Sequence, residues 1–138
     1  MEFALVVPLL LVLVFAIISF AFMLSFRQAL SQAAAEGARA AAVQLDASAR
    51  TTDATTAVND ALAGAGITCA GGVLRDGTTN AGTCVVGPAV GCASAPSQDC
   101  VTVTLTYRYA DHPRVPSFPL VGSMMPEELS YAATVRVS

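Results

Sequence analysis

The feature that most constrains this chain is a run of 24 residues, Phe3 to Phe26, without a charged side chain. As one helix the run would be about 36 Å long, and the hydrocarbon core of a bilayer is about 30 Å thick. Pro8 removes a backbone donor within the run, so we expect a bend or a loosened turn there. The run is too long for the apolar core of a signal peptide, and no small-residue cleavage site follows it promptly. We therefore expect residues 1–26 to form a transmembrane helix that stays attached.

The net charge of the chain after the apolar run limits the kinds of partner that can be expected. Residues 27–138 contain seven arginines, no lysine and nine acidic residues, so their net charge is −2. A nucleic-acid partner would require a basic patch, which this balance argues against. The part is also small, so its own hydrophobic core is expected to be marginal without further stabilisation.

Residues 27–50 extend the helical pattern beyond the apolar run, because they lack proline and consist mainly of good helix formers. Small and apolar residues recur at helical spacing on one side, and the packing stripe we single out is Leu30, Ala34, Gly37, Ala38 and Ala41, flanked by Ala33 and Leu45. Gln28, Gln32, Glu36, Arg39 and Asp46 lie on the other side. Two interpretations remain open: an exposed alanine helix, or a helix that packs lengthwise against neighbouring subunits.

A short second helix is predicted after residue 50. It would be capped near Thr52 or Asp53 and would end at Gly64 and Gly66. Its apolar stripe would consist of Val58, Ala61 and Leu62. Residues 27–66 are therefore expected to form a helical stalk and a second short helix.

Residues 67–138 have the pattern of strands and turns. Asp76-Gly77 suits a tight turn of a first hairpin, and residues 100–110 and 129–138 alternate between apolar and polar side chains. Strands with one buried face are typical of an antiparallel sheet packed on a helix. The sequence thus predicts an α+β fold: a long N-terminal helix, a short helix and a small antiparallel β head over residues 67–138.

Four cysteines lie within this head, namely Cys69, Cys84, Cys92 and Cys100. No C-x2-C pair occurs and His112 is the only histidine, so the spacing does not favour zinc. An even count in a small tethered domain favours two disulfides and an oxidising compartment, with four buried free thiols as the alternative.

Three disulfide connectivities are possible, and strand geometry favours one of them. If Leu74 opposes Thr79 across the first hairpin, Cys69 falls opposite Cys84. Cys92 is then left to pair with Cys100. Each disulfide would stabilise the head by about 2–4 kcal/mol.

Catalytic motifs are missing from the sequence. Asp111, His112 and Ser117 lie in an irregular, proline-rich stretch without a nucleophile-elbow pattern. The glycine-containing segments 64–66 and 71–72 lack both a lysine and a following helix, as a phosphate-binding loop would require. We therefore expect a protein that is not an enzyme and that needs neither a cofactor nor a metal.

Several stretches together resemble one family. They are Glu2-Phe3-Ala4-Leu5, Pro8 with its leucine run, AAAEGARAAA at residues 33–42, and the closing strands VTVTLTY and ATVRV. This chain resembles the TadE-like pseudopilins of tight-adherence (Flp, type IVc) pilus assembly systems. The similarity spans nearly the whole chain, and its specific part is the N-terminal forty residues.

The resemblance implies a prepilin whose short basic leader is removed by a prepilin peptidase. A Glu-Phe or Glu-Tyr dipeptide then lies just inside the mature chain, with the glutamate commonly as the fifth mature residue. Glu2-Phe3 matches that dipeptide, but no leader precedes it here. We expect Met1 to mark a misplaced start, because family members often carry a valine there and GTG is also a start codon. A lost basic leader would hold the N-terminus in the cytoplasm. The disulfide-forming head would then lie outside, although Arg27 and Arg39 alone would favour the opposite orientation.

The resemblance also implies a role for the glutamate. An ionised carboxylate in lipid is costly unless it is paired, and pilin assembly supplies the N-terminal amine of the adjacent subunit. The alternative is that Glu2 is solvated at the headgroup level. Glu2 and Phe3 would thus serve assembly, and Pro8 would make the helix pliant.

These observations predict a minor pilin or pseudopilin of a bacterial adhesion pilus. Its partners would be the lipid bilayer, other pilins, the assembly machinery and, if a leader was lost, the prepilin peptidase. The alternative is a single-pass membrane-anchored binding module that joins no filament and recognises a ligand through residues 111–126.

Overall fold

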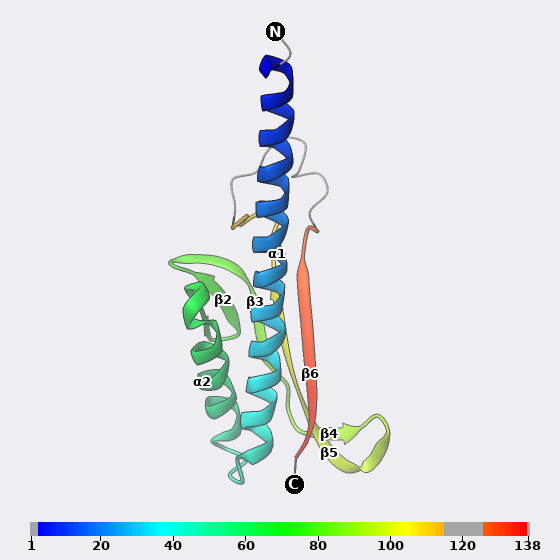
Figure 1. Ribbon diagram of the computed structural model, residues 1–138. Helices are drawn as coiled ribbons and strands as arrows, with labels where there is room; N and C mark the ends of the chain where they lie inside the picture. The colour runs from blue at the N-terminus through cyan, green and yellow to red at the C-terminus, as the bar shows by residue number, and fades with distance from the viewer. Residues whose placement is uncertain (1–2, 115–125, 138) are drawn as a thin grey trace.

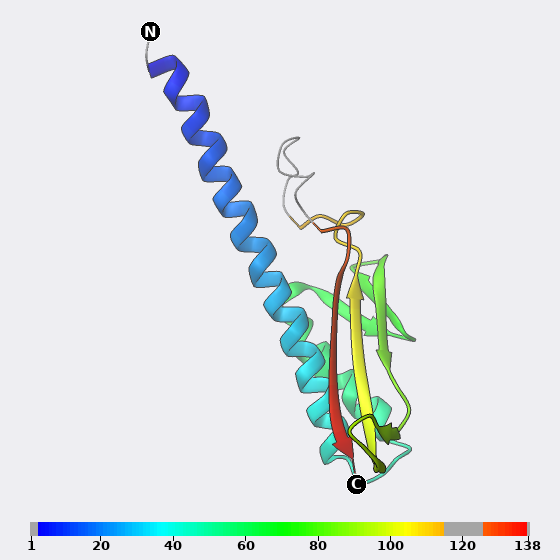
Figure 2. The same ribbon diagram turned by 90° about the vertical axis from the view of Figure 1, so that its right-hand side faces the viewer.

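A computed structural model describes residues 3–114 and 126–137 of the chain. One long helix, α1 (Phe3–Val43), packs through its C-terminal half against a head and extends beyond the head at its N-terminal end (Figures 1 and 2). The elements that follow are α2 (Arg50–Leu62), the 3-10 turn η1 (Ala63–Ala65), β1 (Ile67–Ala70), β2 (Val73–Asp76), β3 (Thr79–Val86), β4 (Val90–Cys92), β5 (Ala95–Tyr107) and β6 (Leu129–Val137). The predicted α+β fold is confirmed.

The described strands form one antiparallel sheet in the order β1-β2-β3-β5-β4, with β6 paired to β5. Strands β5 and β6 pair without interruption from Asp99 opposite Val137 to Tyr107 opposite Leu129. As the alternation predicted, Val101, Val103, Leu105 and Tyr107 of β5 are buried.

The core lies where α1 and α2 meet the inward face of the sheet. Leu30 and Ala34 of α1, Val58 and Leu62 of α2, and Leu105 of β5 belong to one buried cluster. The small residues of α1, which are alanines and Gly37, let the helices and the sheet approach closely. Residues 27–66, predicted as a stalk, therefore contribute side chains to the head's core.

The end of α1 and the start of α2 differ from the predicted residues. α1 ends at Val43 rather than continuing to residue 50, and Leu45 is 83% exposed. The Asp46 carboxylate accepts hydrogen bonds from the Ser48 backbone N–H (2.9 Å) and hydroxyl (2.7 Å), which turns the chain and lowers the pKa of Asp46.

Helix α2 begins at Arg50, so the predicted cap near Thr52 or Asp53 is wrong. The N-cap residue is Ala49, which makes no side-chain cap hydrogen bond, and the Asp53 carboxylate instead accepts a hydrogen bond from Gln44. The buried residues of α2 include Ala54 rather than Ala61, which is exposed. α2 ends at Leu62, before the predicted stop. Gly66 instead ends the 3-10 turn η1 that follows, and it adopts the left-handed conformation with a φ of 67°.

The predicted first hairpin is in fact three strands. Gly71 and Gly72, with φ values of 59° and 81°, reverse the chain between β1 and β2. Leu74 therefore lies opposite Cys69 on one side and Gly82 on the other, and the predicted pairing of Leu74 with Thr79 is wrong. The tight turn at Asp76-Gly77 is present, with a φ of 59° at Gly77.

Two disulfides join the cysteines. Cys69 is bonded to Cys84 with a Cα–Cα distance of 5.9 Å, and Cys92 is bonded to Cys100 with a Cα–Cα distance of 5.0 Å. This is the connectivity that the sequence favoured. The first disulfide joins β1 to β3 past the short strand β2, and the second closes the β4–β5 hairpin.

Candidate functional site

The N-terminal half of α1 is apolar on all sides and uncovered by the head. Exposed side chains occur at almost every described position from Phe3, which is 86% exposed, to Leu24. Within the described residues, this is the one helix long and apolar enough to cross a membrane. A helix that is apolar all around requires lipid or other helices as its surroundings.

The structure describes two of the three residues of the predicted assembly motif. Glu2 lies outside the described residues. Phe3 is the first residue of α1, and Pro8 lies inside the helix, where its ring nitrogen cannot donate a hydrogen bond to the Ala4 carbonyl. Pro8 also lines a shallow apolar hollow of about 600 Å³ together with Leu9, Val12, Leu13 and Ala16.

The packing stripe on α1 faces the chain's own head. Leu30, Ala34, Gly37, Ala38 and Ala41 are all buried. A Cβ atom on Gly37 would lie 2.6 Å from Val58 Cγ2 of α2 and 3.4 Å from Val103 Cγ1 of β5. Both interpretations of the stripe therefore need correction, because these side chains are neither exposed nor available to a neighbouring subunit. Periodicity identified the face, but it did not identify what the face packs on.

A cluster of aromatic rings marks the junction where α1 leaves the head. Phe26 packs edge-on against Tyr107, with the ring centroids 4.7 Å apart, and lies 6.3 Å from the ring of Tyr109. The Arg114 guanidinium lies over the ring of Phe26, with its Cζ 5.2 Å from the ring centroid. Sequence reasoning missed this cluster, although the inward-facing pair Tyr107 and Tyr109 at the end of a strand was its signal.

Polar contacts fix the same junction. The Tyr107 hydroxyl donates to the His112 carbonyl oxygen at 3.0 Å and lies 3.2 Å from Asp76 Oδ2. Burial raises the pKa of the Tyr107 and Tyr109 phenols above the ordinary value, and the positive charge of Arg114 opposes this rise. On the other side of α1, Arg27 Nε donates to the Tyr131 hydroxyl of β6 at 2.6 Å. Helix α1 is therefore held to the head at a defined orientation.

The outward face of the sheet carries hydroxyl groups in cross-strand pairs. Thr102 and Thr134 lie 2.8 Å apart between their Oγ1 atoms, and Thr106 Oγ1 lies 3.0 Å from Ser130 Oγ. Of the predicted recognition segment 111–126, residues 115–125 lie outside the described residues. Within the described part, His112 Nε2 contacts the Asn80 carbonyl oxygen at 3.0 Å.

Metal ligation finds no support in this geometry. Among residues 3–114 and 126–137, no three histidine, cysteine or acidic side chains converge in a way that could hold an ion. All four cysteines are consumed by disulfides. The structure thus combines an exposed apolar helix with a head that two disulfides cross-link.

Comparison with known proteins assigns the N-terminal part of the chain. Residues 1–39 match the family model described as TadE-like protein, which covers the apolar run and most of the packing stripe. No match was found among curated proteins or among solved structures. An N-terminal apolar helix and this match fit a membrane-anchored protein associated with Tad pilus machinery. Residues 1–39 are therefore similar to TadE-like proteins, as the resemblance of the sequence predicted.

Proposed function

We propose that this chain is a non-enzymatic minor pilin or pseudopilin that takes part in assembling a Tad (Flp, type IVc) pilus used for surface attachment. Its anchor would be residues 3–22 of α1 in the cytoplasmic membrane, and its head would lie on the extracytoplasmic side. The observation that carries the proposal is the continuity of α1, which is apolar and uncovered at one end and built into the core of the head at the other.

Helix packing is the physical basis of the proposed assembly. While the subunit is in the bilayer, lipid covers the exposed apolar side chains between Phe3 and Leu24. In a filament, the same side chains would be covered by the helices of neighbouring subunits. The packing stripe is already used inside the head, so contacts between subunits would involve the N-terminal half of α1 and the outer surface of the head.

The two disulfides support the proposed side of the membrane. Disulfides persist in oxidising compartments and are rare in the bacterial cytosol. Cys69 and Cys84 are both buried in the head. An extracytoplasmic head would form both bonds as it emerges from the membrane.

The role proposed for Glu2 can be tested by substitutions made in the full-length gene. We expect Glu2→Gln to abolish incorporation of the protein into pili, because a neutral amide cannot form an ion pair with the N-terminal amine of a neighbour. Glu2→Asp, which keeps the charge, should retain part of the incorporation. Membrane insertion should be equal in all three proteins. Normal incorporation of the Gln variant would contradict the proposed pairing and favour a glutamate solvated at the headgroup level.

A second candidate function is a membrane-anchored binding module that joins no filament. The exposed hydroxyl pairs on β5 and β6 favour it, since they offer a polar surface that no element of the described head covers. Immunoelectron microscopy of an epitope-tagged protein would separate the two functions. Label along sheared pili supports the pilin, whereas label confined to the membrane fraction without pilus components supports the binding module.

A further inference from the structure

A hollow of about 450 Å³ lies where α1 leaves the head. Its walls are formed by Phe22, Ser25 and Phe26 of α1, Ala61 and Gly64 at the end of α2, and Arg114. One wall is thus part of the anchor helix, and the opposite wall belongs to the head. The apolar side of the hollow continues directly into the exposed apolar surface of α1.

The position of the hollow relative to a bilayer follows from helix geometry and rests on the proposed membrane anchoring. The twenty residues from Phe3 to Phe22 span about 30 Å as a helix, which equals the thickness of the hydrocarbon core. Phe22 therefore lies at the boundary of the core, and Ser25 and Phe26 lie at the level of the lipid headgroups. The hollow opens at the depth where phospholipids carry their phosphate groups.

Arg114 gives the hollow its chemistry. Its side chain is 26% exposed, and its Nε lies 3.5 Å from Asp76 Oδ2 without a hydrogen bond. Among the described residues, its buried Nε and Nη2 atoms have no hydrogen-bond acceptor. Unpaired donors are costly near an apolar surface, and a guanidinium group matches two oxygens of a phosphate.

Neighbouring charges restrict the site to one phosphate group. Arg27, which follows Phe26 on α1, already donates to Tyr131. Asp76 partly neutralises Arg114 and would repel a second negative charge. A single phosphodiester, with its glycerol and acyl chain lying along Phe22, fits both the charge and the apolar wall.

We infer that this hollow binds the phosphodiester of a membrane phospholipid, with Arg114 as the donor and with Phe22 and Phe26 contacting the acyl chain. The bound lipid fills the angle between the anchor helix and the head. It is held by the subunit in the bilayer, and it must be released or carried along when α1 leaves the membrane.

Native mass spectrometry of the full chain, released from nanodiscs of phosphatidylethanolamine and phosphatidylglycerol at a 3:1 ratio, tests this inference. The unmodified protein should retain one phospholipid, and Arg114→Gln should reduce the retained fraction at least fivefold. Arg75→Gln is the matched control, because Arg75 is an exposed arginine on β2 of the same head. Equal retention in all three proteins would overturn the inference, as would an equal loss in both variants.

Two further variants keep the test informative if Arg114→Gln disturbs folding. Arg114→Lys keeps the charge but loses the fork of donors, so its retention should fall between the other two. Asp76→Asn removes the competing carboxylate and should retain at least as much lipid as the unmodified protein. A loss in Asp76→Asn equal to that expected for Arg114→Gln would count against the site.

A final comparison separates a lipid phosphate from free phosphate. Inorganic phosphate at millimolar concentration should leave lipid retention unchanged, because it makes no contact with the apolar wall. Displacement of the lipid by inorganic phosphate alone would show that the acyl chain contributes nothing, and would overturn the lipid assignment. None of these readouts involves pili, so failure of lipid binding and failure of the proposed pilin function are distinguishable.

Discussion

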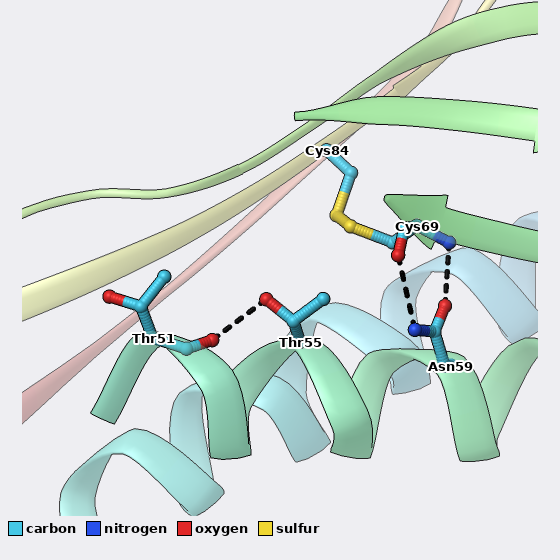
Figure 3. Close-up of a disulfide and its surroundings, with 5 residues drawn as sticks. All are labelled: Thr51, Thr55, Asn59, Cys69 and Cys84. Atoms are coloured by element: carbon cyan, nitrogen blue, oxygen red, sulfur yellow. Dashed lines mark hydrogen bonds between the residues drawn. A yellow bond between two sulfur atoms is a disulfide. The ribbon is translucent and has the colours of Figure 1, made fainter. Parts of the chain in front are cut away.

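The side-chain amide of Asn59 on α2 makes both backbone hydrogen bonds of Cys69 on β1. Asn59 Nδ2 donates to the Cys69 carbonyl oxygen at 3.1 Å, and the Cys69 N–H donates to Asn59 Oδ1 at 2.5 Å (Figure 3). The amide thus acts as a neighbouring strand would, at the edge of the sheet. Because Cys69 is also bonded to Cys84, this one residue connects α2, β1 and β3.

Replacing Asn59 by alanine should destabilise the head by about 1–3 kcal/mol, because a buried N–H and a buried carbonyl lose their partners. Thr55→Ala is the control: it removes a hydrogen bond to the Thr51 carbonyl on the same face of α2, within the helix itself (Figure 3). That change should stay within about 0.5 kcal/mol. Thermal unfolding of the full chain in detergent, followed by near-ultraviolet circular dichroism, measures both. Equal midpoints for the two variants would show that the amide contacts contribute little.

The disulfide connectivity was predictable although the strand register was not. The pattern of cysteines and turns indicated which segments come together, and Asp76-Gly77 correctly located the second turn. The reversal at Gly71-Gly72 was missed, because a four-residue strand such as β1 has too few positions for alternation to be recognised. The connectivity survives this error because Cys69 and Cys84 come close together in both arrangements. They face each other across one hairpin in the predicted arrangement, and they lie on either side of β2 in the structure.

Periodicity could not predict which element the packing stripe of α1 packs against. A face of alanines and a glycine indicates close approach of another backbone, and this holds equally for a neighbouring subunit and for the chain's own α2. The contact between Phe26 and Arg114 could not be predicted for another reason. Phe26 and Arg114 are far apart in sequence, and they meet only because β5 returns the chain to the point where α1 leaves the head.

Substituting alanine for Gly37 should force α1 and α2 apart. The new Cβ would lie 2.6 Å from Val58 Cγ2 and 3.2 Å from the Ala54 carbonyl oxygen, and such overpacking costs about 1–3 kcal/mol. Gly64→Ala should be neutral by comparison, since a Cβ there meets no atom within 4 Å. Adding Val58→Ala to Gly37→Ala removes the closest contact, so the two changes together should cost less than their sum. Strict additivity in unfolding measurements would mean that the two residues do not interact.

The two disulfides should differ in what their removal costs. Cys69 and Cys84 are 15 residues apart, and Cys92 and Cys100 are 8 apart. Loop-closure entropy gives about 3 kcal/mol for the longer loop and about 2.5 kcal/mol for the shorter. The longer one also lies in the main core cluster, so removing it should disturb packing as well. We expect Cys69→Ser with Cys84→Ser to lower the unfolding midpoint more than Cys92→Ser with Cys100→Ser. The reverse order would indicate that β4 stabilises the head more than β1 does.

The junction tyrosines predict a loss of stability at high pH. Burial raises the pKa of Tyr107 and Tyr109 above the value of about 10 that a free phenol has. A group whose pKa is raised by folding contributes its full stabilisation below the unfolded pKa, and this stabilisation is lost as the pH rises through the folded pKa.

The contribution of Tyr107 and Tyr109 to stability should therefore be constant up to about pH 10 and should fall at higher pH. Titration of the phenolate absorbance in the folded protein should show a late component that Tyr107→Phe and Tyr109→Phe each reduce. Because the charge of Arg114 lowers the pKa of both phenols, Arg114→Gln should shift the late component to still higher pH. A shift to lower pH in that variant would mean that the guanidinium does not act on the phenols and that the junction is more open to water than its packing indicates.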